Sequence, residues 1–204
     1  MNTDAGAGRA RLRSPAGFTD ARWRTVDIVV VAVIAVAFGV VFWAWDYLWG
    51  FTAPLFSAFA PGEYIGSGVW LMQAVIAPLI VRKPGAAIFA EMVAAIVSAL
   101  LGNQWALDVV LSGFVQGAGA ELVFLAMRYR RWTLPVALGA GAGAAVGEVV
   151  HDIPIYYPTV GAVLQLSIVV IAILSAVAIA GLGGWYLVRA LRRAGVLEAF
   201  PSLP

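Results

Sequence analysis

The stretch Val-Gln-Gly-Ala-Gly-Ala-Glu at residues 115–121 lies inside an otherwise apolar run over residues 109–127. It places two polar side chains, Gln116 and Glu121, where the surrounding sequence predicts lipid or protein interior. A carboxylate at such depth costs at least a few kcal/mol unless it is paired or faces a wet cavity. The small residues between the two allow neighbouring helix backbones to come close. We therefore expect the other apolar segments to pack around this one and form a polar pocket.

The composition of the 204 residues is that of an integral membrane protein. Hydrophobic residues make up 62% of the chain and charged residues 12%, about half the charged share of a soluble domain. The spans leave no room for a soluble ATPase, kinase or nuclease domain, so such a domain would be a separate chain. The absence of cysteine excludes disulfides and a thiol nucleophile. We expect no cofactor, no metal site and no nucleic-acid partner.

The apolar pattern predicts an all-α bundle of six transmembrane helices, since each crossing needs about 20 apolar residues. The expected spans are residues 25–49, 64–81, 86–101, 107–127, 133–150 and 163–187. A loop that contains His151, Asp152 and Pro154 is expected after the fifth span. The chain then divides into a basic N-terminal arm (1–24), a six-helix domain (25–194) and a short C-terminal tail (195–204).

The distribution of positive charge predicts the topology. All 13 Lys and Arg residues lie in the N-terminal arm, the connection between spans 2 and 3, the connection between spans 4 and 5, and the C-terminal end. The other three connections contain none. The positive-inside rule therefore places both termini in the cytoplasm.

Acidic residues gather at the opposite ends of the spans, without any basic residue to balance them. They are Asp46, Glu63, Asp108, Glu148 and Asp152. A cavity at that end would have a negative potential and would favour a cation. Aromatic rings attract organic cations, and several are expected nearby: Trp43, Trp45, Trp70, Trp105, Tyr156 and Tyr157. The tryptophans would also serve as membrane anchors, and of these Trp70 and Trp105 are the better binding candidates.

Glu91 and Glu121 occupy similar depths on neighbouring antiparallel spans, which allows their carboxylates to meet. They would form either a shared site for a cationic ligand or proton, or a structural hydrogen-bonded pair. Gln116 would hydrogen-bond the heterocycle of a ligand or join two helices. Asp152 is a candidate for the mouth of the pocket, whereas His151, the only histidine, is interpreted as an interfacial residue.

Two small-residue patterns indicate helix packing. The Gly-Ala alternation at residues 139–144 lacks the preceding strand that a dinucleotide site needs, so close packing explains it better. Ala35 and Gly39, with Ala32 nearby, form a small-residue face that packs within the monomer or docks a partner helix. No nucleophile triad, phosphate-binding loop or metalloprotease motif is present, so the chain is not expected to be an enzyme.

Three spaced motifs resemble the YkoE family of substrate-binding S components of energy-coupling factor (ECF) transporters. They are Arg-Lys-Pro-Gly-Ala-Ala at residues 82–87 followed by Glu91, Leu-Leu-Gly-Asn at 100–103, and the stretch at 115–121. The resemblance implies a six-helix fold in the bacterial plasma membrane that captures thiamine or its hydroxymethylpyrimidine (HMP) precursor from outside the cell. It also implies a transmembrane coupling subunit and two ABC ATPase domains as partners.

The resemblance makes four residues ligand candidates: Glu91, Asn103, Gln116 and Glu121. Chemistry adds Trp70 and Asp152. The positions that fit the partner-docking face of the first helix are Ala32, Ala35 and Gly39. Thiamine is a cation with two aromatic rings, which agrees with the acidic, aromatic pocket inferred above. Two alternatives stay open: a proton-coupled secondary carrier for a small organic cation, and a ligand-free membrane assembly subunit.

Overall fold

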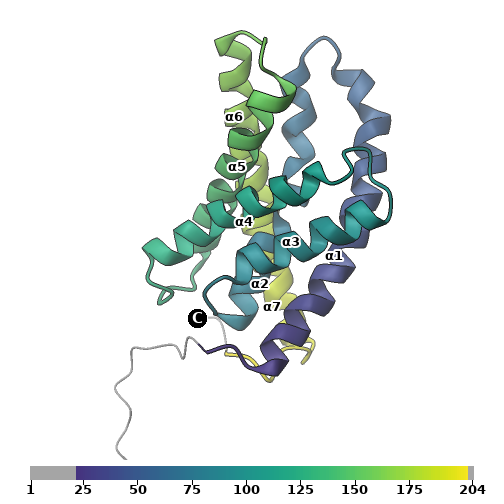
Figure 1. The fold of residues 1–204 in the computed structure, drawn as a ribbon. Coiled ribbons are helices and arrows are strands. Elements are labelled where there is room, and N and C mark those ends of the chain that lie inside the picture. The colour runs from purple at the N-terminus through teal and green to yellow at the C-terminus, as the bar shows by residue number, and fades with distance from the viewer. Residues whose placement is uncertain (1–21, 202–204) are drawn as a thin grey trace, which may run out of the picture.

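The computed structural model describes residues 22–201, and these residues are all-helical (Figure 1). Two 3₁₀ segments, η1 and η2, follow the first helix, and a π-helical segment, η3, joins the last two helices. The elements in chain order are α1 (Thr25–Thr52), η1 (Ala53–Phe56), η2 (Ala60–Val69), α2 (Met72–Val81), α3 (Ala86–Leu100), α4 (Asp108–Ala126), α5 (Leu134–Tyr156), α6 (Ala162–Ala176), η3 (Val177–Gly183) and α7 (Gly184–Arg193).

Within the described residues, five helical segments are long and apolar enough to cross a membrane. They are Thr25–Phe56, Ala60–Val81, Asp108–Ala126, Leu134–Tyr156 and Ala162–Arg193. The third predicted span corresponds to α3, which is apolar but only 15 residues long. The predicted all-α bundle is therefore confirmed, with five spanning segments and one shorter apolar helix. The cytoplasmic location of both termini stays a prediction.

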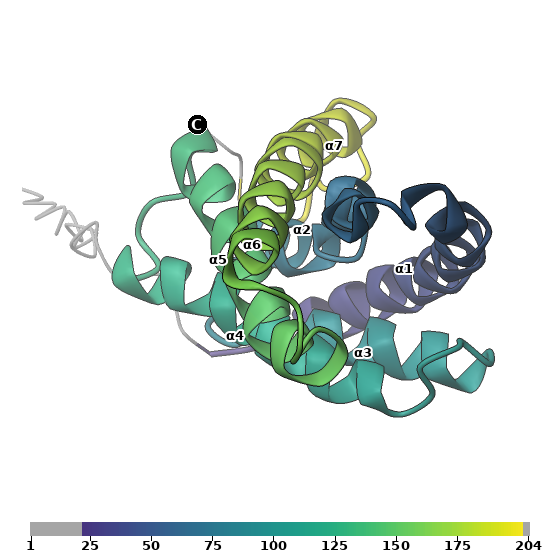
Figure 2. The ribbon, with the colours of Figure 1, turned by 90° about the horizontal axis from the view of Figure 1, so that it is seen from above.

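The helices α3 and α4 run obliquely across the bundle, whereas α1, α5 and α6 are more upright (Figure 1). Seen from above, α1 and α6 lie on different sides of α2, and α3 and α4 occupy one edge of the bundle (Figure 2). The α4 helix packs against α3 on one side and α5 on the other, while α3 also packs against α1 and η2 against α6. The stretch at 115–121 therefore lies between α3 and α5 at this edge of the bundle, and the other spans do not surround it as expected.

Small residues let α4 approach its neighbours closely, as the sequence predicted. A Cβ atom added at Gly119 would overlap the carbonyl oxygen of Gly143 on α5. One added at Gly117 would lie 2.7 Å from the Cα atom of Ile88 on α3. In the Gly-Ala alternation, a Cβ at Gly141 would lie 2.7 Å from the carbonyl oxygen of Ala176. Both patterns therefore serve backbone-to-backbone packing.

The loop predicted after residue 150 is wrong, because α5 continues to Tyr156 through His151, Asp152 and Pro154. Proline lacks an N–H, so Pro154 cannot donate the helical hydrogen bond to the carbonyl oxygen of Val150. Val150 is 62% exposed and lies near the end of the helix, where losing one bond does little to the turns before it. The extra turn carries His151 and Asp152 to the start of α4, where His151 lies between Asp152 and Asp108.

The start of α1 and the α2–α3 turn lie together at one end of the bundle. The indole N–H of Trp23 donates to the carbonyl oxygen of Pro84 at 3.0 Å, and Lys83 Nζ lies 4.0 Å from the Asp27 carboxylate. Two residues of the predicted tail, Leu197 and Phe200, are buried in the hydrophobic core. Arg9, Arg11 and Arg13 of the predicted arm lie outside the described residues.

The contact between α4 and α5 gives a prediction for stability. Gly119→Ala would force a methyl group into the Gly143 carbonyl, so the helices must separate. We expect a loss of about 1–3 kcal/mol, the usual cost of overpacking, seen as a lower apparent Tm in detergent. Gly139→Ala is the matched control, because its Cβ would meet Val123 at 3.4 Å, ordinary contact. Equal Tm values for the two variants would contradict this account.

Candidate functional site

One cavity of about 240 Å³ lies among the helices. Its walls come from α1, η2, α3, the α3–α4 turn, α4 and the end of α5. The lining residues are Phe42, Asp46, Trp49, Glu63, Tyr64, Trp70, Glu91, Ala95, Ser98, Trp105, Asp108, Val109, Ser112, Gln116, Glu148, Asp152, Tyr156 and Tyr157. Segments more than 100 residues apart in the sequence therefore meet at a single site.

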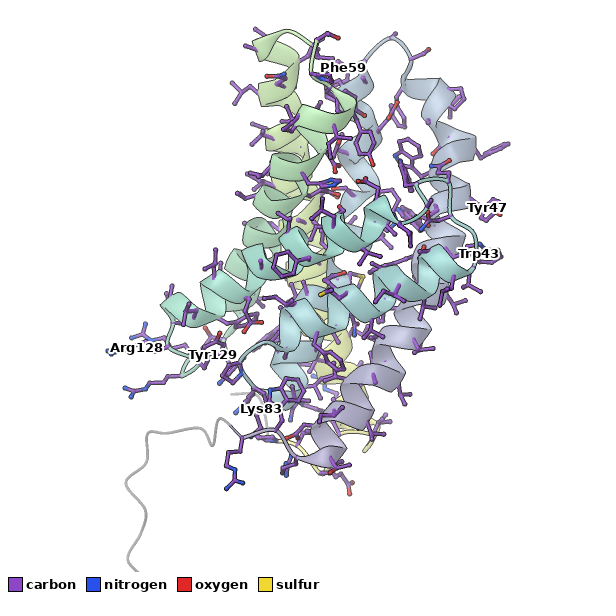
Figure 3. All side chains as sticks on the ribbon, viewed as in Figure 1. Trp43, Tyr47, Phe59, Lys83, Arg128 and Tyr129 are labelled. Atoms are coloured by element: carbon purple, nitrogen blue, oxygen red, sulfur yellow. The ribbon has the colours of Figure 1, made fainter. Side chains whose placement is uncertain are left out.

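The cavity lies in the half of the bundle that is distant from the basic turns. Its lining comes from the C-terminal halves of α1 and α5, the N-terminal half of α4, η2, the turns that follow η2 and α3, and α3 from Glu91 onward. Figure 3 shows Lys83, Arg128 and Tyr129 at one end of the molecule and Tyr47 and Phe59 toward the other. The basic side chains of those turns therefore lie far from the acids that line the cavity.

Six carboxylates line the cavity, and its described lining includes no lysine or arginine. The acids are Asp46, Glu63, Glu91, Asp108, Glu148 and Asp152. Charges inside a low-dielectric wall interact more strongly than in water. The acids that the sequence predicted for this end, without lysine or arginine beside them, therefore line one concave site.

Neutral hydroxyl and indole groups hydrogen-bond several of these acids. Asp46 accepts from the Trp70 indole N–H at 2.7 Å and from the Ser98 hydroxyl at 2.8 Å. Asp152 accepts from the Tyr64 hydroxyl at 3.0 Å. The Tyr156 hydroxyl donates to Asp108 in a short contact. These donors orient the acids and are themselves uncharged.

His151 lies between two of the acids, near the C-terminal end of α5. Its Nδ1 is 2.8 Å from Asp152 Oδ1 and its Nε2 is 3.3 Å from Asp108 Oδ1. Only the first contact has hydrogen-bond geometry, since Nε2 has no hydrogen-bond partner among the described residues. The ring is buried, and the interpretation of His151 as a residue at the membrane interface stays a prediction. The extra turn of α5 brings it over the start of α4.

Glu91 and Glu148 differ from the other acids, because each keeps one buried oxygen without a hydrogen-bond partner. Glu91 Oε1 accepts from the main-chain N–H of Ala74 at 2.7 Å, but its Oε2 has no partner among the described residues. The same holds for Oε2 of Glu148. A buried carboxylate oxygen left unsatisfied is costly. Donor groups of a bound molecule would satisfy both of these oxygens.

Three tryptophans form one wall of the cavity, which we call the aromatic wall. The ring centroids of Trp49 and Trp105 are 5.1 Å apart, those of Trp70 and Trp105 5.8 Å, and those of Trp49 and Trp70 6.4 Å. Trp49 belongs to α1, Trp70 to the turn between η2 and α2, and Trp105 to the turn between α3 and α4. Faces of this kind bind aromatic heterocycles and organic cations.

The structure brings together four of the six predicted ligand residues in this cavity: Trp70, Glu91, Gln116 and Asp152. Asn103 and Glu121 do not line it. The principal site residue that was not selected is Glu148, which the sequence showed only as one of the acids without a basic neighbour. Residue 148 already lay inside the predicted fifth span, so the missing information was which face of α5 points inward.

The small-residue face of α1 is turned inward. Ala35 and Gly39 are buried, and a Cβ on Gly39 would lie 2.5 Å from Val97 Cβ on α3. Ala32 is half-buried. Of the two expectations for this face, packing within the monomer is therefore the one that the structure bears out for Ala35 and Gly39. In this structure the two residues offer no surface to a partner.

Comparison with known proteins agrees with the geometry. The sequence matches the family described as "ABC-type cobalt transport system, permease component" over residues 26–147. It is 36% identical over 177 residues to YkoE of Bacillus subtilis (strain 168), which is named as an HMP/thiamine permease protein. That match covers 86% of this chain and 88% of its relative. A crystal structure of an S component of an ECF transporter superposes with a TM-score of 0.84 at 35% identity, covering 87% of this chain and 90% of that one.

The chain belongs to the YkoE family of ECF-transporter S components. It is a multi-pass membrane protein that captures a substrate, and it is not an enzyme. Within residues 22–201, no group of three or more His, Asp or Glu side chains is placed to hold a metal ion.

In this S component, Glu121 joins two turns at the basic end instead of facing the cavity. Its carboxylate accepts from the main-chain N–H groups of Gly85 at 2.6 Å and Ala87 at 2.9 Å, and from the Tyr129 hydroxyl at 2.7 Å. Burial and this hydrogen bond raise the pKa of Tyr129 above its ordinary value, so the hydroxyl remains a donor. Glu91 and Glu121 thus have separate partners and do not form the expected pair.

These contacts predict that Glu121 stabilises the S component. Glu121→Gln would replace one acceptor oxygen by an NH₂ group facing a donor, leaving at least one of the three donors unsatisfied. We expect a loss of about 1–3 kcal/mol, measured as a lower apparent Tm in detergent. Glu198→Gln removes an equal charge from an exposed residue of the C-terminal tail and should leave Tm unchanged. A Tm for Glu121→Gln equal to this control would contradict the assignment.

Proposed function

We propose that this S component binds thiamine in the cavity and receives it from outside the cell. The observation that carries the proposal is a cavity with six carboxylates and no lysine or arginine in its described lining, beside three tryptophans. A permanent organic cation with two aromatic rings matches both features. The relative named as an HMP/thiamine permease supports the same ligand class.

Glu91 and Glu148 are the residues that we assign to the charged or donor groups of the ligand. Each presents a buried oxygen that lacks a partner, and a charge-assisted hydrogen bond is worth about 1.5–3 kcal/mol. The aromatic wall would stack on a ring of the ligand. Gln116, whose amide donates to Ser112 at 2.8 Å, and Asp152 complete the set of predicted ligand residues that face the cavity.

The electrostatics distinguish thiamine from HMP. The thiazolium ring of thiamine carries a positive charge that HMP lacks. The acids of the cavity therefore attract thiamine electrostatically and do not attract HMP in this way. We therefore expect thiamine to bind at least tenfold more tightly than HMP. Titration of purified protein, followed by tryptophan fluorescence, measures both dissociation constants. Equal constants would show that the acids do not select for charge.

Substitutions test the two glutamates in the same titration. Glu91→Gln and Glu148→Gln should each weaken thiamine binding about tenfold or more, a loss of roughly 1.4 kcal/mol per factor of ten. Glu198→Gln should bind as the wild type does, because it changes charge equally but lies outside the cavity. Unchanged affinity in both cavity variants would remove these residues from the site.

We further propose that the cavity end faces the outside of the bacterial plasma membrane and the basic turns face the cytoplasm, in accordance with the positive-inside rule. In that orientation a transmembrane coupling subunit and two ATPase domains would act from the cytoplasmic side. The absence of cysteine allows a direct test with single cysteines at two exposed positions. Thr159 lies in the α5–α6 connection at the cavity end, and Ala194 follows α7 at the basic end.

A membrane-impermeant thiol reagent should label Thr159→Cys in intact cells and should label Ala194→Cys only after the membrane is permeabilised. Labelling of Ala194→Cys in intact cells, with Thr159→Cys protected, would reverse the proposed orientation.

A further inference from the structure

Asn103 is a buried polar residue in the otherwise largely exposed turn between α3 and α4. Two residues of this turn have left-handed backbone conformations, Gly102 at φ 89° and Ala106 at φ 53°. Such a conformation strains a non-glycine residue, so other contacts must hold the turn in place. The side chain of Asn103 makes two of them, in opposite directions.

The first contact orders Trp105. The Asn103 Oδ1 atom accepts from the main-chain N–H of Trp105 at 2.9 Å, the short-range bond by which Asn side chains fix turns. The indole of Trp105 then packs against Trp49 and, at 86° between ring planes, against Trp70. Through its own main chain, the turn therefore positions one ring of the aromatic wall.

The second contact reaches Trp70 by another route. The Asn103 Nδ2 group donates to the Ser98 hydroxyl at 3.2 Å, and this hydroxyl donates to Asp46 Oδ2 at 2.8 Å. The other oxygen of Asp46 accepts from the Trp70 indole N–H at 2.7 Å. Each link has the geometry of an ordinary hydrogen bond, and each donor has one acceptor.

Both routes end on rings that touch each other, so the contacts form a closed circuit. In order, the members are Asn103, Trp105, Trp70, Asp46, Ser98 and again Asn103. Asn103 is the one member with a hydrogen bond to each branch, and it does not line the main cavity. It lines a separate crevice with Asp46 and Gly102. Any effect it has on a ligand must therefore pass through the other members.

We propose that Asn103 is a positioning residue that fixes the aromatic wall in its binding geometry before a ligand arrives. This inference rests on the proposed function for its effect on affinity, but not for its effect on the tryptophans. A wall that is ordered in advance loses less conformational freedom on binding, which favours affinity and slows dissociation. The role replaces the direct ligand contact that the sequence predicted for Asn103.

The test compares four variants by near-UV circular dichroism of the ligand-free protein and by thiamine dissociation kinetics. Asn103→Ala breaks both branches, and we expect a clear loss of tryptophan signal and about tenfold weaker binding, mainly through faster dissociation. Ser98→Ala breaks only the branch to Asp46, and Asn103→Asp keeps the acceptor for Trp105 but loses the donor to Ser98. Both should give smaller losses of the same kind. Gln104→Ala, at an exposed neighbouring position, is the matched control and should behave as the wild type.

A near-UV spectrum of Asn103→Ala that matches that of Gln104→Ala would overturn the positioning role. A changed spectrum with unchanged thiamine dissociation would overturn its connection to capture. If Asn103→Ala fails to fold, Ser98→Ala and Asn103→Asp still decide, since wild-type spectra for both would refute the circuit. If wild-type protein does not bind thiamine, the proposed function fails, while the spectra of the ligand-free variants still test the positioning role.

Discussion

The gathering of acids in a cavity whose described lining includes no lysine or arginine is the constraint on which the rest of this structure depends. Each acid in the cavity needs donors, and the fold supplies neutral ones: tyrosine hydroxyls, an indole N–H, a serine and a main-chain N–H. Neutral donors keep the acids oriented without bringing a positive charge into the cavity. Glu91 and Glu148 retain one unsatisfied oxygen each, so the cavity offers hydrogen-bond acceptors that the donor groups of a ligand can use.

Close packing elsewhere makes this arrangement possible. The glycines of α4 and α5 bring two backbones into contact, and van der Waals contact replaces the hydrophobic driving force that is weak between helices in lipid. The same close approach continues beside the cavity, where a Cβ atom at Gly113 would lie 3.3 Å from the carbonyl oxygen of Glu91 on α3. Glu121 belongs to this supporting part of the fold: its three hydrogen bonds join the α2–α3 turn to α4 and to the turn that follows it.

The apolar segments, the charge distribution and the small-residue packing were predictable because they depend on residue type and period alone. Trp70, Glu91, Gln116 and Asp152 were also identified, and they converge in one cavity. The roles of Glu121 and Asn103 were not predictable, since their partners are main-chain groups of turns whose course only the tertiary structure defines. Glu148 lay inside the predicted fifth span but was missed as a ligand candidate, because no local signal indicated which face of α5 would point inward.

The second span contains a 3₁₀ segment, Ala60–Val69, that ends next to Trp70. A 3₁₀ helix rises about 2.0 Å per residue against about 1.5 Å in an α-helix, so these ten residues reach roughly 5 Å further than an α-helix of equal length would. The same segment carries Glu63 and Tyr64 into the cavity. Rewinding it as an α-helix would shorten this wall and turn both side chains about the helix axis. The 3₁₀ winding of the second span therefore sets the height and the direction at which Glu63 and Tyr64 enter the binding chamber.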